Sequence, residues 1–282
     1  MINKNSDNLI GELQLAARDI RCNLLKLCSM QNIHIGGDLS SADMITALWQ
    51  YFMKYNPLDP KDELRDRFIL SKGHASAVVT FNQAAIGCFD DEDVYREYAT
   101  DTGRFSMHSC NLINPFVEVS TGSLGHGMPV ACGIAKALQL KNNIYNRVYV
   151  LTGDGEHCEG SMWEAVANAY HEKLGNLVVI VDNNGLSADG SLDKLTGIGS
   201  IADKYKSYGW IVFEIDGNSM KDIVACLSSL PNPVSSVPIA IVGHTIKGKG
   251  VSFMENQGKW HSGKITQEEC DMAINELRNC FE

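Results

Sequence analysis

The stretch from Val148 to Leu186 constrains the fold of this chain more than any other. Apolar runs at 148–151 and 177–181 stand on either side of a segment whose apolar residues recur every three or four positions. Two such runs around one amphipathic helix predict a βαβ unit. Because this crossover makes the strands parallel, their carboxyl ends meet at one sheet edge, where ligands bind in open α/β sheets.

Polar turns follow both runs directly, so we expect them side by side at that edge. A GDG turn (153–155) follows the first run and a DNNG turn (182–185) follows the second. Asp154 offers a carboxylate oxygen and Asn184 an amide oxygen, and such hard ligands suit Mg²⁺ or Ca²⁺ held jointly with a phosphate. Each turn alone is a common loop signal, so the hypothesis depends on their combination.

Composition and charge disfavour several classes of protein. The 282 residues carry a net charge of −10, which disfavours nucleic acid or an anionic membrane as the main partner. The polar start lacks the apolar segment of a signal peptide, and no apolar run approaches the roughly 18 residues that span a bilayer. Nine cysteines are scattered without a C-x-x-C pair, as is typical of reduced thiols, so we expect a cytoplasmic protein.

The rest of the chain repeats the alternation of strand and helix. Further short strands are expected at 68–70, 211–215 and 238–242, with helices in most intervals. About five strands separated by helices predict an α/β fold, a doubly wound parallel sheet with helices on both faces. We expect residues 1–282 to form a single domain, with a C-terminal loop and helix at about 244–282.

Two histidines lie where loops meet helices. His34 begins the stretch HIGGDLS, whose two glycines predict a loop, and Ser40 with Asp43 predicts the cap of the helix that follows. His74, in SKGHAS, comes just after the 68–70 strand and near a helix N-terminus, which favours an anion.

Other candidate residues lie in long irregular segments. His108 lies within 99–118, and His261 within a loop at 246–264 that contains glycine and lysine. Loops of this length in a compact domain are usually functional or mobile. The segment STGSLGHG (120–127) is spaced G-x-x-G-x-G, which disfavours a Rossmann phosphate loop but allows the backbone to contact a flat ligand.

Together, these loops resemble in order the N-terminal, diphosphate-binding domain of transketolase, over nearly the whole chain. The GDG turn, a spacer of 27 residues (156–182) and the NN pair resemble the thiamine diphosphate motif. HIGGDLS, SKGHAS, STGSLGHG and the GKG loop before His261 match other loops of the family. The resemblance implies a thiamine diphosphate-binding fold and transfer of a two-carbon ketol unit from a ketose phosphate to an aldose acceptor.

The resemblance also implies a site for magnesium and thiamine diphosphate. The implied metal ligands are Asp154, Asn184 and the main-chain carbonyl of Leu186, with Ca²⁺ or Mn²⁺ as alternatives to Mg²⁺. Glu159 takes the family's acidic position at the contact between subunits. The implied cofactor contacts are His74, Gly122, Ser123, Leu124, Gly153, Asp154, Gly155, Glu156, Glu159, Asn184, Leu186 and His261.

Four histidines are the implied catalytic residues: His34, His74, His108 and His261. Proton transfers at sugar hydroxyl groups near pH 7 suit this side chain. His108 matches least closely, because it lacks the glycine and proline beside the family's histidine. We expect structural or surface roles for the remaining histidines, which are His126, His157, His171 and His244.

The matching domain of transketolase is followed by a pyrimidine-binding domain, which is not found in this sequence. The resemblance therefore implies the N-terminal subunit of a split transketolase, with sugar phosphates as substrates. Its implied partner is a separately encoded C-terminal subunit that carries the pyrimidine-binding domain. Self-association of the diphosphate-binding chains is also implied.

Two alternatives stay open at this stage. The alpha subunit of a 2-oxoacid dehydrogenase shares the GDG and NN turns, but it does not explain the HIGG, SKGHA and GKG–His261 loops. A non-catalytic, cofactor-binding regulatory subunit would keep the same fold, and fold alone does not prove activity.

Overall fold

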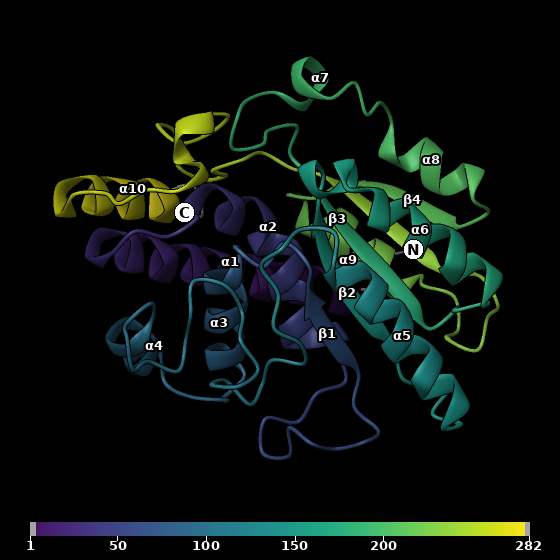
Figure 1. Cartoon of the computed structure of the whole chain (residues 1–282). Coiled ribbons are helices and arrows are strands. Elements are labelled where there is room, and N and C mark those ends of the chain that lie inside the picture. Colours follow the sequence, from purple (N-terminus) through teal and green to yellow (C-terminus); the bar gives the residue numbers. More distant parts are fainter. Residues whose placement is uncertain (1–3, 280–282) are drawn as a thin grey trace.

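A five-stranded parallel sheet with helices on both faces forms the computed structural model, which describes residues 4–279 (Figure 1). Every neighbouring pair of strands is parallel. The observed architecture confirms the predicted α/β fold class. Across the sheet, the strands are β1 (Arg67–Leu70), β2 (Val148–Gly153), β3 (Leu177–Asn183), β5 (Ile239–His244) and β4 (Ile211–Asp216).

Side chains that alternate along the strands build an apolar core on each face of the sheet. In β3, Val178 and Ile180 join one cluster, whereas Val179 and Val181 join the other. A strand buried on both faces has a continuous apolar sequence. This explains why the central strands appear in the sequence as apolar runs without polar alternation.

The first face is covered by the N-terminal helices and the last ones. The long helix α1 packs against α2 and α10, as its apolar spacing predicts. Helix α10 begins with a capping box, in which Thr266 N–H donates to Glu269 Oε2 (2.8 Å) and Glu269 N–H donates to Thr266 Oγ1 (3.1 Å). The elements on this side are α1 (Lys4–Met30), α2 (Ile35–Ala47), the π-helical turn η1 (Leu48–Phe52), α3 (Ser76–Ala85), α4 (Asp91–Glu97), α9 (Met220–Ser228) and α10 (Gln267–Asn279).

The second face is covered by α5 (Gly127–Leu140), α6 (Gly160–His171) and α8 (Ile201–Ser207). Helix α6 connects β2 to β3, so the predicted βαβ unit is confirmed. The connection between β3 and α8 contains the short helix α7 (Leu192–Leu195).

The start of α2 differs from the prediction. The helix begins at Ile35 with His34 as its N-cap, so the expected glycine loop and the expected cap at Ser40 are wrong. Close packing explains the glycine, because a Cβ atom on Gly36 would lie 2.5 Å from the carbonyl oxygen of Trp260. Tertiary contact here outweighs the low helix propensity of glycine.

The carboxyl ends of the strands bring distant segments of the chain together. In the parallel register Gly153 pairs with Asp182, and Asn183 pairs with His244. The turns after β2, β3 and β5 therefore lie next to one another, at the edge where the sequence predicts a ligand site. Within residues 4–279, no helix has the length and apolarity needed to cross a membrane.

Candidate functional site

A cavity of about 370 Å³ lies beyond the carboxyl ends of β2 and β3. Residues from α2, from the loops after β1 and β3 and from the short helix η3 (Gly258–His261) contribute to its wall. The predicted cofactor residues that line it are His74, Leu124, Gly153, Asp154, Gly155, Glu156, Asn184, Leu186 and His261.

The Asp154 side chain lies at the end of β2 and is only 3% exposed. Its Oδ1 accepts a hydrogen bond from Gly155 N–H (2.7 Å), and its Oδ2 accepts one from Gly185 N–H. Burial and the nearby charge of Asp182 raise the pKa of Asp154 to about 6. The carboxylate is thus held by main-chain donors and keeps lone pairs for a cation.

Asn184 and Leu186 place two further oxygen atoms at this cavity. Asn184 Oδ1 accepts from Leu186 N–H (3.1 Å), and the Leu186 carbonyl accepts from Lys247 Nζ (3.1 Å). One carboxylate, one amide and one carbonyl form a hard donor set that fits Mg²⁺, with phosphate oxygens completing the shell. In the described part of the chain, no three His, Cys, Asp or Glu side chains form a metal-binding group, and two of the three donors here are an amide oxygen and a main-chain carbonyl oxygen.

The four predicted catalytic histidines come together beside the cavity. The ring centroid of His34 lies 5.2 Å from that of His74 and 5.5 Å from those of His108 and His261. His34 Nδ1 is buried and has no hydrogen-bond partner among the described residues. An unpaired buried ring nitrogen of this kind indicates a place for a ligand atom.

Burial keeps three of these histidines neutral. Desolvation, followed by the charges of His108 and two lysines, lowers the pKa of His34 to about 4. Desolvation and nearby lysines also lower the pKa of His261 to about 4 and that of His74 to about 2. Neutral imidazoles offer both an N–H donor and a nitrogen acceptor at neutral pH.

Two buried lysines, which sequence reasoning missed, add positive charge to the site. Lys72 and Lys247 are 1% and 2% exposed. Lys247 Nζ lies 3.1 Å from His261 Nδ1, and burial together with Lys72 lowers the pKa of Lys247 to about 8. Both residues follow strands, β1 and β5, and this position was the available signal. The Lys247 ammonium group beside the oxygen donors fits a diphosphate.

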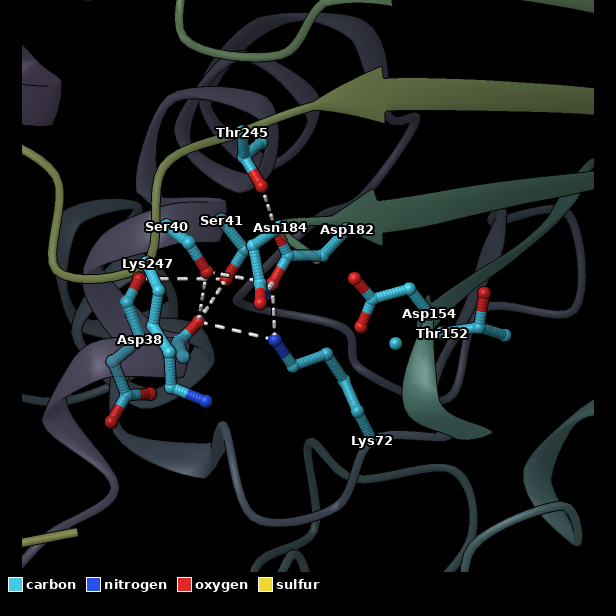
Figure 2. A network of polar contacts seen from close by, with 12 residues as sticks. Asp38, Ser40, Ser41, Lys72, Thr152, Asp154, Asp182, Asn184, Thr245 and Lys247 are labelled. Carbon is cyan, nitrogen blue, oxygen red and sulfur yellow. Dashed lines mark hydrogen bonds and ion pairs between the residues drawn. The ribbon is translucent and has the colours of Figure 1, made fainter. Parts of the chain in front are cut away.

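Asp182, near the end of β3, is the carboxylate that faces Lys72 (Figure 2). Burial alone would raise the pKa of Asp182, but the Lys72 ammonium and the hydrogen-bond donors around it bring this pKa below its ordinary value. The sequence shows Asp182 only as the first residue of the DNNG turn. Its hydrogen bonds come from Lys72 Nζ (2.5 Å), Ser40 Oγ (2.6 Å), Asn184 Nδ2 (3.1 Å) and Thr245 Oγ1.

The Glu156 carboxylate ties three loops of the site together. It accepts hydrogen bonds from Ser71 Oγ (2.6 Å), Gly125 N–H (2.9 Å) and Gly153 N–H (3.2 Å). The loops after β1 and β2 and the STGSLGHG loop therefore share one buried anchor. A direct contact between Glu156 and the cofactor remains a prediction.

Some predicted residues lie outside the cavity wall. Gly122 lies against the ring of His108, while Ser123 and Glu159 are exposed to solvent. The roles proposed for these residues stay predictions. His157, expected to be structural, lies in the interior, with Nδ1 2.8 Å from the Gly153 carbonyl oxygen and Nε2 3.1 Å from Tyr205 Oη.

One protein family matches nearly all of this chain. The family described as "Transketolase, thiamine diphosphate binding domain" matches residues 15–279. This chain belongs to the transketolase family. The resemblance to transketolase noted in the sequence is confirmed. The cavity at the sheet edge lies within the thiamine diphosphate-binding domain of that family.

Two relatives of similar length are named as subunits of transketolases. A subunit of the apulose-4-phosphate transketolase of Phocaeicola vulgatus is 38% identical over 253 residues, which cover 88% of this chain and 87% of that protein. A subunit of the 6-deoxy-6-sulfo-D-fructose transketolase of Clostridium sp. is 34% identical over 245 residues, covering 86% of this chain and 88% of that one.

Solved transketolases share the fold of this chain. The Pichia stipitis enzyme, in a crystal structure with sedoheptulose-7-phosphate, superposes with a TM-score of 0.87 at 28% identity. The match covers 96% of this chain but 41% of the Pichia chain, so this chain spans about two fifths of the length of the solved enzyme. These relatives are transketolases or their subunits, which disfavours both a subunit of a 2-oxoacid dehydrogenase and a non-catalytic regulatory protein.

Proposed function

We propose that this chain is the N-terminal subunit of a split transketolase, which binds magnesium and thiamine diphosphate and works with a separately encoded C-terminal subunit. The observation that supports it best is the match with relatives that are themselves subunits. The chain corresponds to 87% of the Phocaeicola vulgatus protein, whereas it corresponds to 41% of a solved transketolase chain. The proposed reaction transfers a two-carbon ketol unit from a ketose phosphate to an aldose acceptor.

In this proposal the sheet edge holds the cofactor through its diphosphate. Asp154, Asn184 and the Leu186 carbonyl would hold Mg²⁺, and their hard oxygen donors support that assignment. The buried ammonium group of Lys247 would balance part of the charge of the diphosphate, since Lys72 is paired with Asp182. When bound, thiamine diphosphate supplies the electron sink that carbon–carbon bond cleavage requires.

The four clustered histidines, His34, His74, His108 and His261, would assist proton transfer at the sugar hydroxyl groups. His34, His74 and His261 have lowered pKa values and are neutral at pH 7, so each ring would donate a hydrogen bond from one nitrogen and accept one at the other. His34 Nδ1 is the clearest candidate, because it is buried without a partner among the described residues. Its neighbour His108 would orient the same hydroxyl groups.

The proposed partner carries the pyrimidine-binding domain and supplies the acid that the cofactor ring needs. Two features beside the cavity support such a contact: Leu195 lines the cavity and is 50% exposed, and Glu159 is exposed at the start of α6. We propose two copies of each chain, with the copies of this chain also in contact. The cysteines among residues 4–279 are free thiols, which supports a cytoplasmic location.

An activity assay tests the proposal. The purified chain is incubated with a ketose phosphate, an aldose phosphate, Mg²⁺ and thiamine diphosphate, before and after addition of the candidate partner. We expect no turnover by this chain alone and turnover by the mixture. Full turnover by the chain alone would refute the split-enzyme hypothesis, and absence of thiamine diphosphate binding to the mixture would refute the cofactor assignment.

A further inference from the structure

Asp182 joins the candidate cation site to three other parts of the molecule. Its buried carboxylate receives hydrogen bonds from α2, from the loops after β1 and β5, and from Asn184, just after β3 (Figure 2). The function proposed above assigns no role to Asp182. A carboxylate that holds four donors at once also determines how each of these donors is oriented.

The contact with Asn184 determines which end of that amide faces the cation site. An ionised carboxylate only accepts hydrogen bonds, so Asn184 presents its Nδ2 to Asp182 at 3.1 Å. The amide oxygen then lies on the opposite side, where it accepts from Leu186 N–H and keeps a lone pair. A cation requires this oxygen, and a flipped amide would present N–H groups to it.

The surroundings of Asp154 also leave its carboxylate available to a cation. Its N–H donates to the carbonyl oxygen of Asp182 at 3.2 Å, so the two acidic residues are close neighbours on adjacent strands. Lys72 lies 2.5 Å from Asp182 and pairs with it in the interior. The pair leaves Asp154 as the carboxylate that is available to a divalent cation.

We propose that Asp182 is a positioning residue of the cation site: its carboxylate, paired with Lys72, holds the Asn184 amide oxygen towards the metal. The inference rests on the metal site of the proposed function. It adds to that site a residue that is not itself a ligand but determines the orientation of one. Contacts of this kind orient metal ligands in many proteins.

The test measures metal affinity rather than turnover. Asp182→Asn is made in the full chain, and Mn²⁺ binding is followed by electron paramagnetic resonance at saturating thiamine diphosphate. We expect the Mn²⁺ dissociation constant to rise about 10- to 100-fold, the usual effect of losing a residue that orients a ligand.

A matched control separates positioning from simple stability. Asp43, on α2, is a buried carboxylate like Asp182, and it pairs with Arg21 at 2.6 Å. Among the described residues, its side-chain hydrogen bonds are with Arg21 and Asn218, and neither of these is a candidate metal ligand. Asp43→Asn is expected to lower the melting temperature as Asp182→Asn does, and to leave the Mn²⁺ dissociation constant unchanged. An equal rise in both variants overturns the proposal.

A second variant covers the case in which Asp182→Asn does not fold. The double substitution Lys72→Met with Asp182→Leu leaves no buried unpaired charge, and such apolar replacements of buried ion pairs are often tolerated. It should show the same rise, and an unchanged Mn²⁺ dissociation constant in either folded variant overturns the proposal. Equal thiamine diphosphate binding by the wild type with and without a divalent ion would instead contradict the metal site itself.

Discussion

Lys247 Nζ donates a hydrogen bond of 3.1 Å to the carbonyl oxygen of Leu186. The acceptor is one of the three proposed metal ligands, and the donor is a buried cation from the loop after β5. This contact joins the loop after β3 to the loop after β5 beside the cavity. A cation bound at this oxygen would compete with Lys247, and the ammonium group would then be free to contact a diphosphate.

Lys247→Met should therefore weaken thiamine diphosphate binding. Hydrogen bonds to charged groups contribute about 1.5–3 kcal/mol, so the dissociation constant should rise roughly 10- to 100-fold. Isothermal titration calorimetry in the presence of Mg²⁺ measures this change. Lys249→Met is the matched control, because Lys249 lies two residues away and pairs with Glu255 at the surface. Equal affinities in the two variants would contradict the role of Lys247.

Asp154→Ala should abolish the dependence of cofactor binding on divalent ions. The substitution removes the only carboxylate among the proposed ligands, and a neutral pair of oxygens holds Mg²⁺ poorly. Titration of thiamine diphosphate with and without Mg²⁺ measures the effect. Asp193→Ala, at an exposed position of α7, serves as the control and should behave as the wild type. Mg²⁺-dependent binding retained by Asp154→Ala would contradict the assignment.

His74→Ala and His261→Ala should each lower turnover far more than stability. A positioned acid or base typically contributes 10²–10⁴-fold to a rate, so kcat with the partner present should fall by about 100-fold or more. Both side chains are partly exposed at the cavity, so we expect the melting temperature to fall by only a few degrees. His171→Ala, exposed at the end of α6, is the control. Full activity in both cavity variants would remove the proposed role.

Asp38 should make stability depend on pH. One carboxylate oxygen accepts from Val78 N–H at 3.0 Å, the other has no partner among the described residues, and burial raises the pKa of Asp38 from 3.8 to about 7. A raised folded-state pKa stabilises the fold at low pH, and this contribution is lost as the pH rises through about 7.

Comparison with Asp38→Asn isolates this contribution, because the histidines titrate alike in both proteins. Between pH 5 and pH 8 the wild type should lose about 2–3 kcal/mol of unfolding free energy relative to the variant. Urea unfolding at several pH values measures both curves. Parallel curves would show that Asp38 ionises without penalty.

The sequence predicts the parts of this site that depend on strand ends. Asp154 and Asn184 are predictable because each follows an apolar run, and parallel strands bring such positions to one edge. Lys247 and Leu186 could not be paired in this way, because 61 positions separate them and no spacing rule relates one loop to the other. The contact depends on side-chain packing that only the folded chain defines.

The start of α2 shows a second limit of sequence reasoning. The two glycines after His34 favour a loop by local propensity, since glycine costs about 1 kcal/mol in a helix. The helix nevertheless includes both, because Gly36 packs against the main chain of Trp260, more than 200 positions away. Local helix propensity mispredicts the conformation where a distant segment occupies the space that a side chain would fill.

The position of β5 between β3 and β4 has a consequence for the order in which the protein matures. The strand pairs with β3 on one side and with β4 on the other, although it is the last of the five strands in sequence order. Thr245, Lys247 and His261 follow it and contact groups placed by earlier strands, which are Asp182, Leu186 and His74. The candidate site is therefore complete only once this last strand has inserted between β3 and β4.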